Sequence, residues 1–297
     1  MNIEIAKVCG LCGGCKRAVT IAQNELENYK NVVLFKEIVH NENVNNMLKN
    51  KGVKIEYSIE NLKSADIVVI RAHGEPPETF EYLNKNGIKY KDCTCFNVKY
   101  IHKRVTEYSS LGYDIIIIGK RGKASGKIHP EVYGIKGYVK TNAILIEDEQ
   151  DLEKLSTDLN KTYLVCQTTF NFAKASDLID KISKIYQNKG VELISNKSVC
   201  PAQKEINKSS AQLAKSSDLM IVVGGANSSN TKELYNNIKT LTKTVFVEDI
   251  KDWKLTLKRE NIQLFDDIKI GLTAGASTQK DELETLKNLI LLDNKQN

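Results

Sequence analysis

The chain has 297 residues, 41% of them hydrophobic and 27% charged, with a formal net charge of +6. No apolar run approaches the roughly 18 residues of a membrane-spanning helix, and no basic block is long enough for a nucleic-acid footprint. The start, MNIEIAKVCG, lacks the apolar stretch of a signal peptide. We therefore expect a globular protein of the cytoplasm with no membrane and no nucleic-acid partner.

The seven cysteines are an odd number and form no dense framework of pairs. Such usage is typical of thiols kept for metal binding or redox chemistry. Cys12, Cys95 and Cys200 each stand in a short polar turn that opens a helical pattern. We expect their three thiolates to converge on one site.

In chain order, each of these cysteines begins one of three unequal copies of a common plan. Helical periodicity over residues 16–29, 97–112 and 205–217 is followed by β-branched runs at 31–41, 113–122 and 218–230. Each copy then continues through a second helix and two more strands, the last of which lie at 66–74, 162–169 and 268–277. This alternation predicts parallel α/β units.

The expected fold class is therefore α/β, with three pseudo-threefold-related small parallel-sheet domains around one central site. The expected domains are residues 1–95 with Cys12, residues 96–197 following Cys95, and residues 198–297 with Cys200 and the C-terminal segment. In open parallel sheets, ligands bind where strands end at their carboxyl edge. Polar residues stand at each such end: His40, Asn41, His73, His129, Glu131, Thr168, Thr169, Asn227, Ser228, Ser229, Asn230 and Ser277.

Three thiolates select zinc, copper(I) or an iron–sulfur cluster, and they leave either a zinc ion or a cubane one protein ligand short. An open iron in such a cubane would bind and polarise a substrate oxygen. The hydroxyl, amide and imidazole groups at the strand ends would bind a phosphate near helix N-termini. Glu131 is the one carboxylate among them, so we expect it to be the proton source, with His129 as its relay partner.

Eight strings occur in the order found in the 4-hydroxy-3-methylbut-2-enyl diphosphate reductase family: GLCGGCKRAV, EIVHN, RAHGEPP, DCTC, HPEV, QTT, GGANSSNT and TAGAS. They extend from about residue 10 to about residue 278, and eight ordered matches are far more specific than any one of them. The chain resembles this family over nearly its whole length.

The resemblance implies a three-domain iron–sulfur enzyme of the methylerythritol phosphate route to isoprenoids. Its reaction removes the allylic hydroxyl of a diphosphate substrate with two electrons and two protons, giving isopentenyl and dimethylallyl diphosphate. It also implies a [4Fe–4S] cluster with three cysteine ligands and one open iron, and a ferredoxin or flavodoxin as electron donor.

The resemblance assigns roles to individual residues of this chain. The cluster ligands fall on Cys12, Cys95 and Cys200, and the catalytic residues on Glu131, His129 and Thr168. The diphosphate-binding set comprises His40, Asn41, His73, His129, Ser228, Ser229, Asn230 and Ser277.

The chain departs from the family pattern around the cluster cysteines. Phe96 replaces the usual proline, residues 201–207 differ from the usual sequence after the third cysteine, and Gln279 and Lys280 replace a Pro-Asp pair. Three alternatives therefore stay open: a paralogue that reduces another small molecule, a non-catalytic sensor holding a cluster or zinc, and a zinc hydrolase using Glu131. Catalytic zinc usually takes histidine and carboxylate ligands, which disfavours the last.

Several residues also have structural interpretations. Cys93 and Cys166 fit core thiols, and His102 fits a core or surface histidine as well as a site residue. Cys9 and Cys15 complete a C-x2-C-x2-C run with Cys12, which could bind a cluster, offer a fourth ligand or hold two reduced thiols. The NSSN stretch could simply cap a helix. A basic face, formed by Lys120, Arg121, Lys123 and Lys127, could be solvated or could receive an acidic electron carrier.

Overall fold

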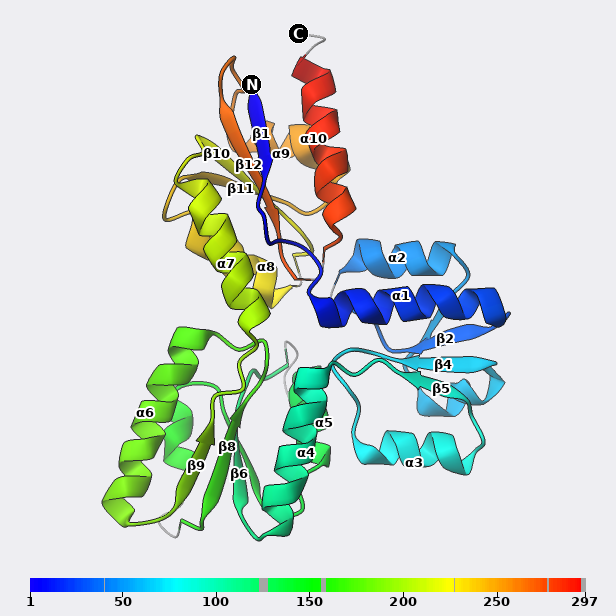
Figure 1. The fold of residues 1–297 in the computed structure, drawn as a ribbon, viewed down its shortest axis with the longest axis vertical. Coiled ribbons are helices and arrows are strands. Elements are labelled where there is room, and N and C mark those ends of the chain that lie inside the picture. The colour runs from blue at the N-terminus through cyan, green and yellow to red at the C-terminus, as the bar shows by residue number, and fades with distance from the viewer. Residues whose placement is uncertain (40, 123–127, 156–158, 227, 277, 295–297) are drawn as a thin grey trace. The chain divides into compact units, whose positions relative to one another are not determined.

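The computed structural model describes residues 1–297 except 40, 123–127, 156–158, 227, 277 and 295–297, and the side chains of residues 229 and 294 are also outside the description. Within the described residues the strands form three four-stranded sheets (Figure 1). The strand pairs with assigned register are all parallel.

The three sheets have the same strand order. The first sheet runs β3 (Lys54–Glu56), β2 (Val32–Phe35), β4 (Ile67–Ile70), β5 (Tyr90–Asp92). The second runs β7 (Ala143–Ile146), β6 (Asp114–Ile118), β8 (Thr162–Cys166), β9 (Leu193–Asn196). The third runs β11 (Lys243–Val247), β10 (Leu219–Val223), β12 (Lys269–Ala274), β1 (Asn2–Ile5). The prediction of three parallel α/β units is confirmed.

The edge strand β5, β9 or β1 of each sheet is the strand that leads to Cys95, Cys200 or Cys12. The third sheet takes this strand from the N-terminus of the chain, because β1 pairs with β12. We expected residues 1–95 to form the first domain, whereas Asn2–Ile5 lies in the third sheet. The domain boundaries after residues 95 and 197 stay a prediction.

Helices alternate with the strands. Their bounds are α1 (Gly13–Asn28), α2 (Glu42–Asn50), α3 (Pro77–Lys85), α4 (Phe96–Ser110), α5 (Pro130–Gly137), α6 (Phe172–Lys189), α7 (Pro201–Ala214), α8 (Ser229–Ile238), α9 (Trp253–Arg259) and α10 (Lys280–Asn294). Short 3-10 helices lie at η1 (Ile59–Ser64), η2 (Glu149–Lys154) and η3 (Ile250–Asp252). Helices α1, α4 and α7 begin directly after Cys12, Cys95 and Cys200, so each cysteine stands at a helix N-terminus.

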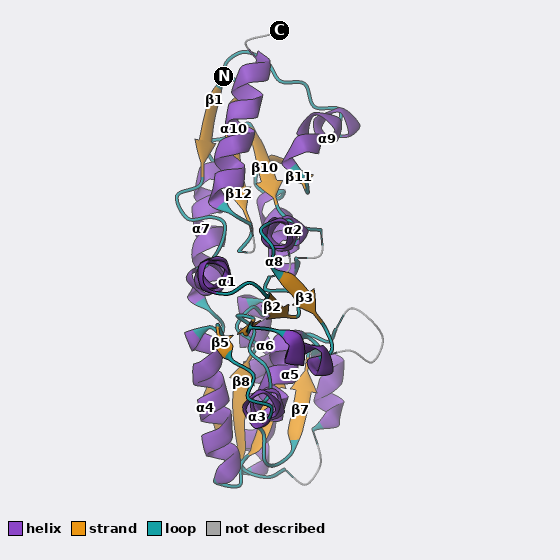
Figure 2. Cartoon of the chain, turned by 90° about the vertical axis from the view of Figure 1, so that its right-hand side faces the viewer, coloured by secondary structure: helices purple, strands orange, loops and turns teal. Residues whose placement is uncertain are grey.

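The second sheet is covered on both faces, which explains why its strands are continuously apolar. Ile116 and Ile118 pack in one core cluster with residues of α6, whereas Ile115 and Ile117 pack in another with residues of α4 and α5. This alternation is the two-residue period of a strand. The third sheet likewise packs against α9 and α10 in one cluster and against α7 and α8 in another (Figure 2).

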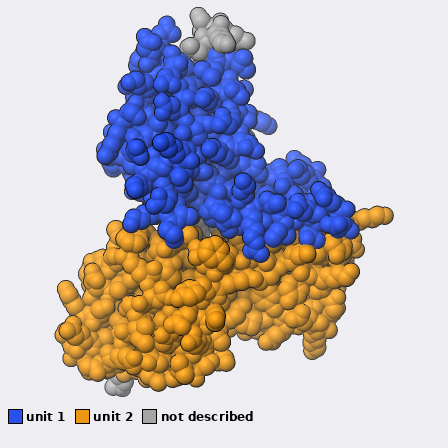
Figure 3. Space-filling view, in the orientation of Figure 1, with its two compact units in different colours: residues 1–28, 37–55, 201–297 blue, residues 29–36, 56–200 orange. Residues whose placement is uncertain are grey.

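The chain divides into two compact units, which Figure 3 colours separately. The first unit comprises Met1–Asn28, Glu37–Ile55 and Pro201–Asn297, and the second comprises Tyr29–Lys36 and Glu56–Cys200. In the part of the chain that is described, no helix has the length and apolar character needed to cross a bilayer.

We expect the core of the second sheet to be sensitive to truncation. Leu164 in β8 is fully buried, so Leu164→Ala should lower the free energy of unfolding by about 2–5 kcal/mol through lost burial and the cavity left behind. The matched control is Leu111→Ala at a residue that is 59% exposed, which should change it by less than about 0.5 kcal/mol. Urea denaturation followed by circular dichroism measures both. Equal losses would contradict this assignment of the core.

Candidate active site

Cys95 and Cys200 lie in the second unit and are tied to strand ends by backbone hydrogen bonds. The Cys95 N–H donates to the Ala72 carbonyl at 2.9 Å, and the Cys200 N–H donates to the Thr168 carbonyl at 2.8 Å. The Asn97 Nδ2 donates to the Cys200 Sγ at 3.3 Å. Because Asn97 lies in the first turn of α4 and Cys95 is the N-cap of that helix, this bond holds the Cys200 thiol beside the helix end that carries Cys95. Asn97 was not among the residues expected from the sequence.

Glu131 is fully buried in the first turn of α5 and faces Thr168 at the end of β8. The Thr168 backbone N–H donates to Glu131 Oε1 at 2.6 Å, and the Thr168 hydroxyl donates to Oε2 at 2.9 Å. Burial raises the pKa of the Glu131 carboxyl to about 7, against the lowering effect of these two hydrogen bonds. This carboxyl group therefore carries a proton in about half of the molecules at neutral pH.

His129 caps the N-terminus of α5, since its Nδ1 accepts the Glu131 N–H at 3.2 Å. An Nδ1 that accepts a hydrogen bond is unprotonated, so the neutral ring carries its proton on Nε2. The buried Gln167 places its Nε2 3.3 Å from the same Nδ1, donates to Thr169 Oγ1 at 2.6 Å, and accepts the Lys120 N–H at 2.8 Å. The sequence analysis took only the threonines of the QTT string and missed Gln167. Its position in the QTT string, directly before the two threonines, could have indicated it.

His73 lies in a tight turn after β4. The Gly74 N–H donates to the Arg71 carbonyl at 3.1 Å, and the rings of His73 and His129 lie edge to face with centroids 5.9 Å apart. Gly74 has φ +76°, and a Cβ there would lie 2.8 Å from His102 Cε1. The structure thus brings together His73 and His129, which the sequence placed on different repeats.

His102 is a core residue that supports this turn. It is buried, stacks on Tyr138 with centroids 4.1 Å apart, and contacts the turn at Gly74. Burial lowers the pKa of His102 to about 4, so the ring is neutral at physiological pH. Of the two interpretations of this histidine, the structure favours the core one.

Cys12 lies in the first unit, beside the turn that follows β12. Its N–H donates to the Ala276 carbonyl at 3.3 Å, and the Leu11 N–H donates to the Thr278 carbonyl at 2.7 Å. A hydrogen bond with the Cys15 side chain, opposed by desolvation and assisted by backbone N–H groups at the start of α1, lowers the pKa of the Cys12 thiol to about 6. Cys12 is therefore largely a thiolate at neutral pH, the form that binds metal.

Asn41 and Ser228 cap helices in the first unit. Asn41 Oδ1 accepts the Val44 N–H at 3.2 Å and its Nδ2 donates to Thr278 Oγ1 at 3.3 Å, so the start of α2 meets the turn beside Cys12. The buried Ser228 accepts the Thr231 N–H at 3.3 Å at the start of α8. Capping by Ser228 is thus confirmed, and it uses the same helix N-terminus that would bind a phosphate.

Asn230 follows in the first turn of α8. Its Oδ1 is buried and has no hydrogen-bond partner among the described residues. A buried polar atom of this kind is costly unless a ligand or water satisfies it. His40 and Ser277 lie outside the described residues, and so does the side chain of Ser229, so those expectations stay predictions.

The remaining cysteines separate into two kinds. Cys93 and Cys166 are fully buried, and burial raises the pKa of Cys166 to about 12, which confirms them as core thiols. Cys9 donates from Sγ to the Ala6 carbonyl at 3.1 Å and packs against the core of the third sheet. None of the seven cysteines forms a disulfide bond.

The residues present suit an iron–sulfur centre by their chemistry. Cys12, Cys95 and Cys200 are half-buried soft donors at helix N-termini, and Cys12 is readily ionised. Within the described residues no group of three or more His, Cys, Asp or Glu side chains that could hold a metal ion is assembled. Cys12 belongs to the first unit, whereas Cys95 and Cys200 belong to the second.

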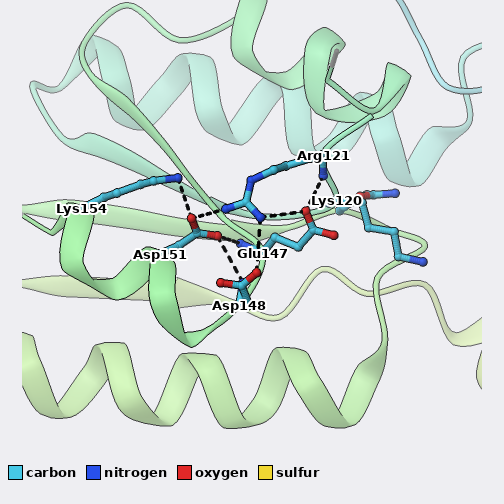
Figure 4. A network of polar contacts seen from close by, with 7 residues as sticks. Lys120, Arg121, Glu147, Asp148, Asp151 and Lys154 are labelled. Atoms are coloured by element: carbon cyan, nitrogen blue, oxygen red, sulfur yellow. Dashed lines mark hydrogen bonds and ion pairs between the residues drawn. The ribbon is translucent and has the colours of Figure 1, made fainter. Parts of the chain in front are cut away.

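The basic residue Arg121 is paired with acidic side chains (Figure 4). Its guanidinium contacts Glu147 and Asp148 at 3.3 Å each and also pairs with Asp151, which Lys154 approaches at 2.5 Å. This charge is therefore largely neutralised, which weakens the expectation that Arg121 receives an acidic carrier. Lys123 and Lys127 lie outside the described residues.

Comparisons with known proteins identify the family. The family model described as LytB protein matches residues 3–290. The 4-hydroxy-3-methylbut-2-enyl diphosphate reductase of Clostridioides difficile (strain 630) is 36% identical over 281 residues, which cover 94% of this chain and 95% of that protein.

Two solved structures agree. One, of (E)-4-hydroxy-3-methyl-but-2-enyl diphosphate reductase, the terminal enzyme of the non-mevalonate pathway, has a TM-score of 0.74 and 32% identity over 98% of this chain and 99% of that one. The other, the E-1-hydroxy-2-methyl-but-2-enyl-4-diphosphate reductase from Plasmodium falciparum, has a TM-score of 0.81 and 27% identity over 97% of this chain and 87% of that one. The chain belongs to the LytB family of 4-hydroxy-3-methylbut-2-enyl diphosphate reductases.

Proposed function

We propose that this chain removes the allylic hydroxyl of 4-hydroxy-3-methylbut-2-enyl diphosphate in a two-electron, two-proton reduction, giving isopentenyl and dimethylallyl diphosphate. The observation that carries the proposal is the fully buried Glu131 carboxyl, whose pKa is raised to about 7. It is bonded to Thr168, whose carbonyl in turn accepts the N–H of Cys200. A proton donor is thereby fixed next to a cysteine at a helix N-terminus.

Enzymes of this family carry a [4Fe–4S] cluster, and we assign its three protein ligands to Cys12, Cys95 and Cys200, with one iron left open. When bound, the cluster would supply the electrons and polarise the carbon–oxygen bond of the substrate. Asn97 would donate to the sulfur of Cys200, and such hydrogen bonds to ligand sulfurs raise the reduction potential of a cluster.

The proton for the leaving oxygen comes from Glu131 in this proposal. The Thr168 hydroxyl and backbone N–H orient the carboxyl group, while the surrounding apolar side chains keep it protonated at a pH where an exposed glutamate is ionised. His129 carries its proton on Nε2 and is held in place through Nδ1 by the start of α5 and by Gln167. It can therefore donate to an anionic oxygen without changing its charge.

The diphosphate is bound, in this proposal, by imidazole, amide and hydroxyl groups at strand ends and helix N-termini. These are His40, Asn41, His73, His129, Ser228, Ser229, Asn230 and Ser277. The buried Oδ1 of Asn230 and the capping positions of Asn41, Ser228 and His129 support the assignment. Helix N-termini favour anions through exposed N–H groups and the helix dipole.

Electrons would come from a small one-electron carrier, a ferredoxin or flavodoxin, and the reaction would take place in the cytoplasm, where free thiols persist. Neither the paralogue nor the sensor alternative finds support, because the relatives reported above carry the name of one reductase and match this chain nearly end to end. The first test is anaerobic purification followed by iron and sulfide analysis and incubation with the diphosphate and a low-potential reductant. About four irons per chain and consumption of the substrate support the proposal; a cluster with no consumption refutes it.

Replacing the proton donor should separate chemistry from cluster binding. Glu131→Gln should keep the cluster absorbance and lower kcat by about 10²–10⁴-fold, because an amide cannot supply the proton. Glu153→Gln, at an exposed residue of the same unit, is the matched control and should keep full activity. Near-normal turnover by Glu131→Gln would show that another group is the acid.

Activity should depend on pH through the raised pKa of Glu131. The protonated acid predominates below about pH 7 and disappears above it, so kcat should be maximal on the acid side and fall about tenfold per pH unit on the alkaline side. A pH–rate profile with a one-electron donor of constant potential measures this. The residual activity of Glu131→Gln should lack this limb, and a wild-type profile that stays flat from pH 6 to 9 would contradict the assignment.

Cys93 and Cys95, on either side of Thr94, provide a test of the cluster ligands. Cys95→Ala should lose most of the iron, because a ligand is removed, whereas Cys93→Ala should retain it, because Cys93 is a fully buried core thiol. Iron content per chain after anaerobic purification distinguishes the two. Equal iron in both variants would exclude Cys95 as a ligand.

A further inference from the structure

Two cations follow adjacent strands of the first sheet and share one carboxylate. Lys36 and Arg71 are the first residues after β2 and β4, whose last residues are register partners. Lys36 Nζ lies 2.7 Å from Glu75 Oε2, and Arg71 Nη2 lies 2.8 Å from Glu75 Oε1. We refer to Lys36, Arg71 and Glu75 as the ion triad.

The ion triad is buried to an extent unusual for charged groups. The exposed fractions of the side chains are 0% for Glu75, 7% for Arg71 and 25% for Lys36. Breaking a buried ion pair by removing one partner is strongly destabilising because an uncompensated charge stays behind. With two cations and one carboxylate, the triad has a net charge of +1.

The backbone at Lys36 is strained. Its φ is +66°, in the left-handed region that costs a side-chain-bearing residue about 1–2 kcal/mol. The Lys36 N–H donates to the Glu56 carbonyl at 2.8 Å, and its Nζ lies 4.3 Å from the Phe35 ring centroid and 5.6 Å from that of Tyr133. A strained residue held by this many contacts indicates a functional constraint.

The ion triad encloses the turn that carries His73. The Arg71–Glu75 pair spans the turn that the Gly74 N–H closes onto the Arg71 carbonyl, and Lys36 fastens Glu75 to the end of β2. Lys36 also contacts Tyr133 on α5, two residues after Glu131. The triad thus connects the segments that bring the rings of His73 and His129 within 5.9 Å.

We propose that the ion triad is a positioning device for binding the anionic substrate, because it fixes the His73 turn to the end of β2 and so holds His73 beside His129. The proposal rests on the proposed function, in which these two histidines bind the diphosphate. The triad residues act through His73 and are not themselves catalytic.

The test compares Glu75→Leu with the double variant Lys36→Gly/Glu75→Leu, using anaerobically purified holoenzyme of matched iron content. Inorganic pyrophosphate is the probe in calorimetric titration, and KM and kcat are measured with the diphosphate substrate. Glu75→Leu should weaken pyrophosphate binding and raise KM about tenfold with kcat within about twofold, the pattern of lost ground-state binding. The double variant should bind pyrophosphate as weakly as Glu75→Leu, because it restores the net charge of +1 but not the link between the end of β2 and the His73 turn. Recovery to wild-type binding would show that charge, and not positioning, is the cause.

The direction in which pyrophosphate affinity changes distinguishes positioning of the histidines from simple electrostatic attraction of the anion. Removing a negative charge would by itself tighten anion binding, so weaker binding by Glu75→Leu can come only from a displaced site. Glu149→Leu, which breaks the exposed pair with Lys181, is the control and should change neither constant. If Glu75→Leu does not fold, the near-isosteric Glu75→Gln decides.

The possible results decide between these roles as follows. Unchanged or tighter pyrophosphate binding in the Glu75 variants overturns the positioning role, and so does a loss of kcat and thermal stability at constant KM, which would be a purely structural effect. A wild-type protein that binds no pyrophosphate also overturns it. A wild-type protein that binds pyrophosphate but does not consume the isoprenoid diphosphate refutes the proposed function, while the comparison of binding constants still tests the triad.

Discussion

Parallel strands deliver their carboxyl ends to one edge of a sheet, and the candidate site residues that the structure describes depend on that edge. The three sheets share one strand order, so each repeats the same geometry: a central strand end, a neighbouring strand end, and an edge strand that leads to a cysteine. Each cysteine then meets a helix N-terminus, where backbone N–H groups favour a thiolate. The same strand order, repeated in three sheets, therefore places both the thiols and the polar groups around them at strand ends.

The Glu131 carboxyl shows how burial and hydrogen bonding compete within that edge. Desolvation favours the neutral acid, whereas the two bonds from Thr168 favour the anion, and the balance leaves its pKa near neutrality. The same Thr168 accepts the Cys200 N–H, and Gln167 beside it orients His129. Acid, imidazole and cysteine are therefore positioned by two consecutive residues at the end of β8, Gln167 and Thr168, and a shift of that strand end would move all of them together.

The ion triad is a second, electrostatic device at the end of the neighbouring sheet. Its carboxylate is fully buried and pairs with two cations, and the strained backbone of Lys36 shows that these contacts outweigh a local cost. The Arg121 cluster has similar chemistry but lies nearer the surface, where water weakens each pair. Burial, more than the number of ion pairs, decides which of the two can hold a turn in place.

Much of this protein could be predicted from the sequence. Alternating apolar runs and helical periods predicted three parallel α/β units, because local patterning is a property of neighbouring residues. The ordered short motifs indicated the candidate site residues Cys95, Cys200, His129, Glu131 and Thr168. Tertiary structure alone decided that β1 completes the third sheet, that Asn97 reaches the Cys200 sulfur, and that Gln167 and the ion triad support the histidines. These contacts join residues far apart in the chain, and the raised pKa of Glu131 depends on burial. Neither property can be read from the order of residues, because both arise only when the segments pack.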